Sequence, residues 1–141
     1  MERRARVLIA DDRPTTRRGL KALLALFPQM EVVGEAENGG ESVDLVAERR
    51  PDLVLMDMQM PVMDGIEATR RIKNLWPEVK VIVLTLHAGY RADALAAGAD
   101  AFLLKDGATE TLLGAIQAQI PGLGATQRCR GRRSRRGNPP V

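Results

Sequence analysis

Acidic residues at two places in this sequence have the types and positions needed to bind one metal cation jointly. Asp11 and Asp12 directly follow one short apolar run, and Asp57 directly follows another. If the two runs are neighbouring strands, three carboxylates meet, and like charges so close either raise a pKa or require a cation. Mg²⁺ suits such a group, because it is commonly held by one or two carboxylates, some waters and a phosphate oxygen. The acidic residues therefore predict an Mg²⁺ site.

Asp57 is the best-placed nucleophile of the three acids. Once a cation draws charge away, a carboxylate can attack a phosphoryl group, a reaction in which positioning and charge neutralisation do most of the catalysis. Lys105 follows another apolar run and can neutralise a phosphoryl oxygen as a point charge. The hydroxyl of Thr85 can donate a hydrogen bond to a second phosphoryl oxygen. We therefore predict phosphoryl transfer to Asp57.

Short apolar runs precede these polar residues, and helical patterns fill the intervals between the runs. Pro51 is expected to end the second helix, and Gly98 is expected to end the fourth. Most of the runs are continuous rather than alternating, which is typical of parallel strands covered by helices on both faces. The runs lie at residues 7–10, 32–33, 53–56, 81–84 and 102–104, and the helical patterns at about 20–27, 40–50, 68–76, 91–97 and 109–120. This alternation predicts an α/β fold built from five βα units.

All five polar residues stand at the carboxyl ends of predicted strands. In an open parallel sheet that edge is where ligands bind, near the point where the strand order reverses. The shared placement indicates one site made of Asp11, Asp12, Asp57, Thr85 and Lys105.

The composition is that of one soluble globular domain. The chain has 141 residues, of which 45% are hydrophobic and 28% charged, enough for one sizeable core. Its apolar runs are far shorter than the roughly 20 residues that a membrane span needs. A single cysteine, Cys129, excludes an internal disulfide and any multi-cysteine metal site. We expect a cytoplasmic protein with no membrane contact.

Charge is distributed unevenly along the chain. Residues 1–120 hold all 18 acidic residues and 15 of the 21 basic ones, a net charge of 15 − 18 = −3. After Pro121 the apolar pattern stops and Gly, Pro, Ser and Arg dominate, so we expect a disordered tail over 121–141. Its arginines could make weak, sequence-independent contact with nucleic acid. They stand at positions 128, 130, 132, 133, 135 and 136.

The ordered set of motifs resembles the signature of response-regulator receiver domains, over about residues 6–120. The motifs are Asp11-Asp12, the segment Met56-Asp57-Met58-Gln59-Met60-Pro61-Val62-Met63-Asp64-Gly65, Leu84-Thr85 and Leu103-Leu104-Lys105. The resemblance implies a flavodoxin-like, doubly wound, five-stranded parallel sheet of order 2-1-3-4-5 with five helices. It also implies a signalling protein of a two-component phosphorelay rather than an enzyme.

The same resemblance assigns roles at the site. Asp57 would be phosphorylated by a histidine kinase or a phosphotransfer protein. Asp12 would bind Mg²⁺ directly, Asp11 would act largely through water, and the backbone carbonyl of Gln59 would complete the protein ligands, beside Asp57 itself.

The resemblance further implies a conformational switch between the site and a distal surface. Phe102 stands three residues before Lys105, where the family places an aromatic residue that turns inward when the hydroxyl of Thr85 moves toward the phosphoryl group. The readout surface would be the fourth helix, the fifth strand and the fifth helix. It would act on an output protein, whose identity the sequence does not give, or on a dimer surface.

The subtype looks closest to LuxR-type regulators, with two departures. Lys105 is followed by Asp106, where many receivers have a proline after a cis peptide bond, so the isomer of this bond is left open. Thr85 and Lys105 are 105 − 85 = 20 residues apart, about two fewer than is common in the family. We therefore expect the fourth helix to be shortened or shifted.

Other interpretations remain at this point. Asp11 and Asp12 could cap the helix that begins near Pro14, and His87 could tune the lifetime of the phosphoryl group or be a plain surface residue. A haloacid-dehalogenase phosphatase would need a second aspartate where Gln59 stands. A flavodoxin or nucleotide binder would need a phosphate-binding loop after the first strand, and the sequence has no G-x-G-x-x-G or P-loop motif.

A LuxR-type transcription factor would continue into a helix-turn-helix domain of about 60 residues, so we expect a stand-alone receiver. The alternative is a pseudo-receiver, or a truncated transcriptional regulator, that acts through protein or nucleic-acid contacts without phosphorylation.

Overall fold

Five parallel strands form one sheet in the order β2-β1-β3-β4-β5, in a computed structural model that describes residues 4–120. The tail predicted for 121–141 lies outside the described residues. The strands are β1 (Ala5–Ala10), β2 (Met30–Ala36), β3 (Leu53–Asp57), β4 (Lys80–Thr85) and β5 (Ala101–Leu104). The helices are α1 (Pro14–Leu24), α2 (Gly39–Arg49), α3 (Gly65–Leu75), α4 (Arg91–Ala96) and α5 (Thr109–Gln119), with a 3₁₀ turn η1 (Ala88–Tyr90) before α4. The predicted flavodoxin-like order is confirmed.

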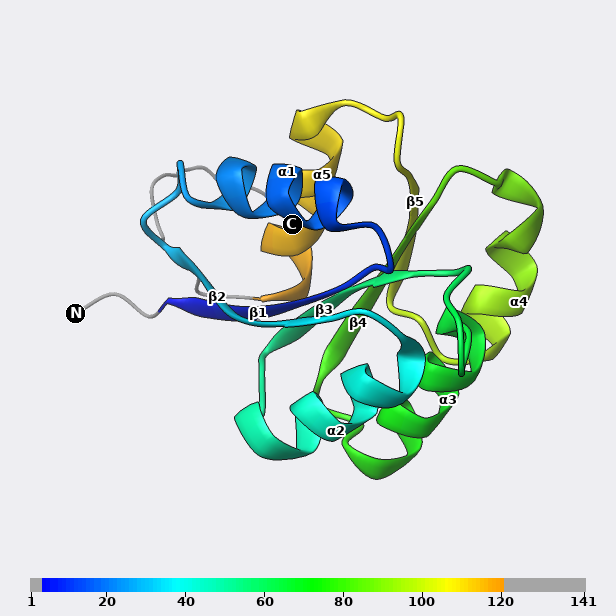
Figure 1. Ribbon diagram of the computed structural model, residues 1–141. Coiled ribbons are helices and arrows are strands. Elements are labelled where there is room, and N and C mark those ends of the chain that lie inside the picture. The colour runs from blue at the N-terminus through cyan, green and yellow to red at the C-terminus, as the bar shows by residue number, and fades with distance from the viewer. Residues whose placement is uncertain (1–3, 121–141) are drawn as a thin grey trace, which may run out of the picture.

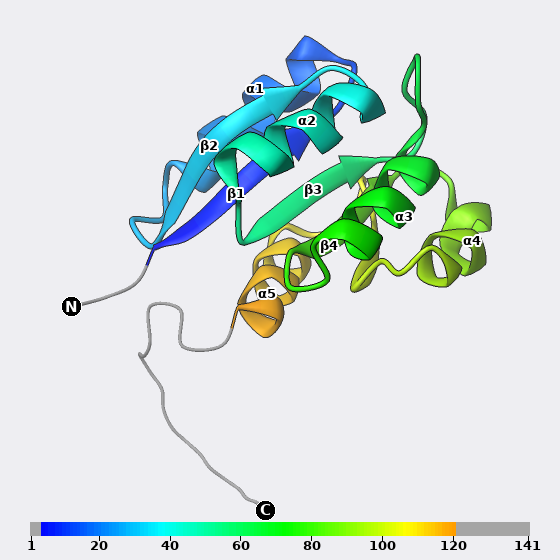
Figure 2. The same cartoon turned by 90° about the horizontal axis from the view of Figure 1, so that it is seen from below.

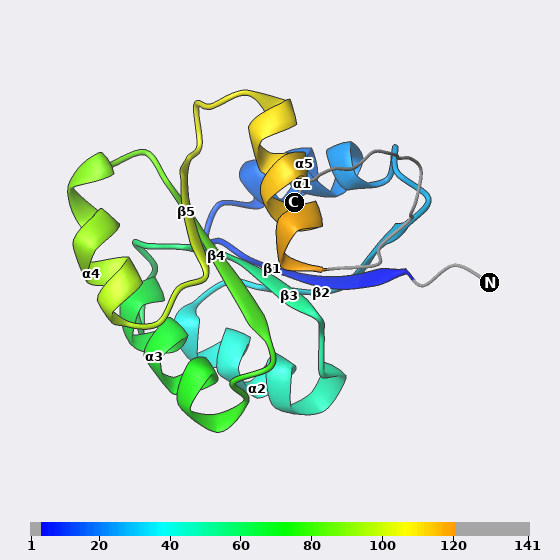
Figure 3. The same cartoon turned by 180° about the vertical axis from the view of Figure 1, so that it is seen from behind.

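The helices lie in two layers with the sheet between them. Helices α1 and α5 cover one face (Figures 1 and 3), and α2 and α3 cover the other, where Figure 2 shows them in front of β1 and β3. Each face has its own apolar core: Leu24 and Ile116 pack with the first pair of helices, and Val46 and Ile72 with the second. Strand β3, in the middle of the sheet, is buried along its whole length, as its continuous apolar run predicts.

Helix α1 ends three residues before its apolar pattern does, and each of the other four helices ends one residue before its pattern does. Phe27 lies beyond the end of α1 and Trp76 beyond the end of α3, although both side chains still pack against the cores. A proline follows each of them, and the residue before a proline is disfavoured in the helical conformation. The predictions for Pro51 and Gly98 are confirmed: α2 ends at Arg49, and Gly98, just after α4, has a positive φ of 106°.

Helix α4 is short, as the 20-residue interval predicts. It has 6 residues, whereas α1, α2, α3 and α5 have 11 each. The 3₁₀ turn at Ala88–Tyr90 occupies part of the interval instead. Within residues 4–120, no helix is both long and apolar enough to span a membrane.

Candidate functional site

The sheet order brings the three acids together at its carboxyl edge. Strands β1 and β3 are neighbours, with Ala10 opposite Met56, so Asp11 and Asp57 extend from adjacent strand ends. One carboxylate oxygen from each of Asp11, Asp12 and Asp57 lies within 4.8 Å of the others. The condition for the predicted cation site, that the two runs be neighbouring strands, is met.

Lys105 joins this acidic cluster from the end of β5. Its Nζ lies 2.7 Å from Oδ2 of Asp11 and 3.0 Å from Oδ1 of Asp57. The side chain is only 14% exposed, so water screens these ion pairs less than it screens a surface pair. Its backbone N–H donates to the carbonyl of Thr85 at 2.8 Å, which fixes the start of the loop after β5.

Burial dominates the electrostatics of Asp57. The residue is 7% exposed, and this desolvation raises the pKa of Asp57 above the usual 3.8, against the lowering effect of the Lys105 ammonium group. The neighbouring Asp11 also raises the pKa of Asp57. The protein's own groups therefore balance the negative charge of the Asp57 carboxylate only in part, and an added cation would stabilise that charge.

Asp11 and Asp12 differ in their surroundings. Asp11 is buried, and besides Lys105 its carboxylate accepts a hydrogen bond from the backbone N–H of Arg13 at 2.8 Å. Arg13 is itself the N-cap of α1 and makes no side-chain capping bond, so the interpretation of Asp11 and Asp12 as helix caps is wrong. Asp12 is exposed and lines a shallow cleft together with Gln59. The side-chain amide of Gln59 donates to the hydroxyl of Tyr90 at 3.1 Å.

The loop from Met58 to Asp64 is held by two glycines that sequence reasoning did not assign to the site. A Cβ at Gly65 would collide with the backbone oxygen of Asp57, and a Cβ at Gly39 would collide with the backbone oxygen of Met63. The N–H of Gly65 donates to the carbonyl of Met58 at 2.8 Å. Asp64 caps α3 by accepting from the N–H of Glu67, and the Asp-x-x-Glu spacing was the signal that could have indicated this cap.

The two proposed switch residues lie on adjacent strands. Thr85 ends β4, is 1% exposed, and its hydroxyl oxygen accepts from the backbone N–H of His87 at 3.3 Å. Phe102, in β5, lies opposite Val83 of β4 and is 8% exposed. The guanidinium carbon of Arg91 lies 5.9 Å from the centre of the Phe102 ring, within the range of a cation–π contact.

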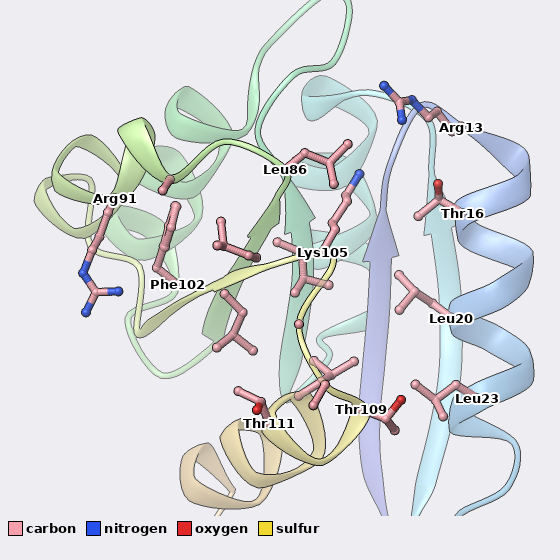
Figure 4. A pocket seen from close by; sticks show the side chains of 17 residues that line it. Arg13, Thr16, Leu20, Leu23, Leu86, Arg91, Phe102, Lys105, Thr109 and Thr111 are labelled. Atoms are coloured by element: carbon pink, nitrogen blue, oxygen red, sulfur yellow. The ribbon is translucent and has the colours of Figure 1, made fainter.

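An apolar groove of about 660 Å³ lies beside Lys105. In Figure 4 the side chains of Leu20 and Leu23 border it from α1, and Lys105 and Phe102 lie on its other side. The residues Thr109 and Thr111 at the start of α5 close its lower end in that view. The groove is thus lined both by Lys105 of the site and by Phe102, the proposed aromatic switch.

Two questions that the sequence left open concern residues near the site. The structure has no cis peptide bond within residues 4–120, so the bond between Lys105 and Asp106 is trans. The side chain of His87 is exposed and its ring stands edge-on to that of Tyr90, with centroids 6.1 Å apart.

Comparisons with known proteins agree with this geometry. The family model of the response regulator receiver domain matches residues 7–117. The transcriptional regulatory protein DegU of Brevibacillus brevis is 38% identical over 123 residues, which cover 86% of this chain and 52% of DegU. The chain spans about half the length of the curated relatives it matches.

Solved structures show the same likeness. A two-component response regulator of the LuxR family from Aurantimonas sp. SI85-9A1 has a TM-score of 0.78 and 35% identity, covering 82% of this chain and 84% of that one. The Borrelia burgdorferi complex of CheX and CheY with BeF₃ and Mg²⁺ has a TM-score of 0.75 and 25% identity, with coverages of 81% and 87%.

Proposed function

This chain belongs to the response regulator receiver domain family, a family of signalling proteins rather than enzymes, and from that membership we propose that Asp57 accepts a phosphoryl group in a two-component phosphorelay. The single observation that carries the proposal is the Lys105 ammonium group 3.0 Å from Asp57, inside a cluster with Asp11 and Asp12. The donor would be a histidine kinase or a phosphotransfer protein.

The acidic cluster fits Mg²⁺, because its donor set consists of carboxylate oxygens that converge within 4.8 Å. We assign Asp57 and the exposed Asp12 as direct ligands, Asp11 as a ligand through water, and the backbone carbonyl of Gln59 as the remaining protein ligand. When bound, Mg²⁺ would neutralise charge that builds up on the phosphoryl oxygens. The Borrelia burgdorferi complex, which is named as holding BeF₃ and Mg²⁺, supports Mg²⁺ as the cation.

The protein's own residues would position the reaction. A carboxylate oxygen of Asp57 forms a bond to phosphorus while the bond from phosphorus to the donor histidine nitrogen breaks. Lys105 is already within reach of Asp57 and would pair with a phosphoryl oxygen. Thr85 would donate a hydrogen bond from its hydroxyl group to another phosphoryl oxygen.

We propose that Thr85 and Phe102 carry the phosphorylated state to the surface of α4, β5 and α5. The groove beside Lys105 supports this route, since Lys105 and Phe102 both line it, so that a shift of either residue changes its shape. Such coupling is a two-state equilibrium biased by a local change of charge. The readout would act on an output protein or on a dimer surface.

We also propose a boundary at about residue 120. Helix α5 ends at Gln119 and the family match ends at residue 117, so residues 1–120 would form the receiver and 121–141 a separate basic segment. Limited trypsin digestion should then cleave first at the arginines beyond residue 120. Early cleavage inside 1–120 would contradict the boundary.

The test of the proposed function is intact mass after incubation with acetyl phosphate and Mg²⁺. Wild type should gain one labile phosphoryl group, whereas Asp57→Asn and a chelated sample should gain none. Asp44→Asn removes an exposed carboxylate on α2 and should be phosphorylated like wild type. If wild type gains nothing and beryllofluoride with Mg²⁺ leaves its spectra unchanged, the pseudo-receiver alternative replaces the proposal.

A further inference from the structure

Arg17 connects three elements next to Asp11 of the acidic cluster, although nothing in the sequence motifs singles it out. It lies in the first turns of α1, and its side chain is 11% exposed. Its Nη1 donates to the backbone carbonyl of Asp11 at 2.5 Å, and its Nε donates to Oε1 of Glu35 on β2 at 3.1 Å. Arg17 thus ties α1 and β2 to the end of β1.

The carbonyl that Arg17 holds belongs to the peptide bond joining Asp11 and Asp12. A peptide unit is planar, so restraining this oxygen restrains the plane that also contains the backbone nitrogen and Cα of Asp12. The other end of Asp11 is also fixed, because its N–H donates to the carbonyl of Ala36 at 3.0 Å. Within residues 4–120, the carboxylate of Asp12 itself has no hydrogen-bond or ion-pair partner. Its position therefore depends on the backbone that Arg17 holds.

We propose that Arg17 is a positioning residue that aims Asp12 at the cation, with Glu35 as its anchor. The inference rests on the proposed function, because it assigns Asp12 as a direct Mg²⁺ ligand. Groups that orient metal ligands without touching the metal commonly change metal affinity by about 10–100-fold when they are lost. Arg17 would have such an effect through a single backbone oxygen.

Lys21 offers a matched control on the same helix. Its Nζ pairs with Oε2 of Glu35 at 2.8 Å and its side chain is 50% exposed, but no hydrogen bond joins it to Asp11. Replacing Lys21 by methionine therefore disturbs Glu35 without releasing the carbonyl of Asp11. Arg17→Met keeps an aliphatic stem and removes both donors.

The experiment is a titration of the metal-free full chain with MgCl₂ at constant ionic strength, followed by backbone amide NMR. Thermal unfolding without Mg²⁺ is measured beside it. Arg17→Met should weaken Mg²⁺ binding about tenfold, and Lys21→Met less than twofold. Arg17→Lys, which keeps the charge but loses the rigid planar fork of the guanidinium group, should fall between Arg17→Met and wild type.

The outcomes separate this inference from the proposed function. If wild type binds Mg²⁺ and the Mg²⁺ affinity of Arg17→Met is within twofold of that of wild type, the positioning role is wrong while the receiver function stands. If Arg17→Met lowers the metal-free melting temperature but not the affinity, Arg17 is structural only. If wild type binds no Mg²⁺, both the proposed site and the role of Arg17 are wrong. If Arg17→Met does not fold, the affinity of Arg17→Lys decides in its place.

Discussion

Lys105 donates a hydrogen bond to Asp11 at 2.7 Å across a sequence separation of 94 residues, while the same Nζ lies 3.0 Å from Asp57. One ammonium group is therefore shared by two carboxylates that come from different strands. In the metal-free chain it acts as the built-in counter-cation of the acidic cluster. A metal cation at the same carboxylates would compete with it for negative charge.

Lys105→Met should destabilise the metal-free protein and strengthen its Mg²⁺ binding. Removing the Lys105 ammonium group from this largely buried ion pair leaves the carboxylates without a positive partner, which lowers the free energy of unfolding by about 3 kcal/mol. The same loss makes the cluster more negative, so Mg²⁺ affinity should rise by at least about threefold. Urea denaturation and an Mg²⁺ titration measure the two effects. An affinity equal to that of wild type would show that Lys105 and the metal do not compete.

Asp57→Asn should stabilise the metal-free protein at neutral pH by about 1 kcal/mol, a common gain when a functional carboxylate is neutralised. The pKa of Asp57 is raised above 3.8 because of burial, so folding favours the protonated form. Its contribution to stability is present at low pH and is lost as the pH rises from 3.8 through the folded-state pKa.

Thermal unfolding between pH 4 and pH 8 checks this sign. The advantage of Asp57→Asn over wild type should be full above the raised pKa and should shrink as the pH falls toward 3.8. Asp44→Asn provides the control, because it removes an exposed acid. A constant difference across the pH range would mean that burial of the charge is not the cause.

Val62→Asn should stabilise the protein by about 1 kcal/mol. Val62 has a φ of 70°, a left-handed conformation that costs an ordinary residue roughly 1–2 kcal/mol and that asparagine tolerates better. The side chain is 88% exposed, so little packing is lost on replacement. Denaturant midpoints for Val62→Asn and Val62→Ala form the comparison, since alanine keeps the strain. Equal midpoints for the two variants would contradict this prediction.

Gly65→Ala should destabilise the protein and weaken Mg²⁺ binding, because a Cβ there would collide with the backbone of Asp57. Forcing this contact apart should cost about 3 kcal/mol and displace the loop that carries Gln59. Gly114→Ala on α5 is the matched control: a Cβ there meets nothing within 4 Å, so a gain of about 0.5–1 kcal/mol is expected. Thermal unfolding of both variants is the measurement. A Gly65→Ala variant as stable as wild type would refute the steric argument.

Local sequence patterns predicted the fold closely where an element is buried by its own residues. The continuous run before Asp57 became the fully buried β3, and Gly98 ended α4 as predicted. One edge strand was predicted less well: β2 extends over Met30–Ala36, far beyond the two valines that marked it. Its remaining positions include Glu31, Gly34 and Glu35, because an edge strand with partial exposure tolerates polar residues and gives no apolar signal.

What the sequence determined by itself was the set of chemical groups and the edge of the sheet at which they stand, since strand ends follow from local patterns. Only the tertiary structure decided how the groups share charge: that Lys105 bridges Asp11 and Asp57, that burial raises the pKa of Asp57, and that Arg17 holds the carbonyl of Asp11. The reason is physical. Residue types and strand ends are set over a few neighbouring positions, whereas ion pairs and desolvation depend on which distant segments pack side by side.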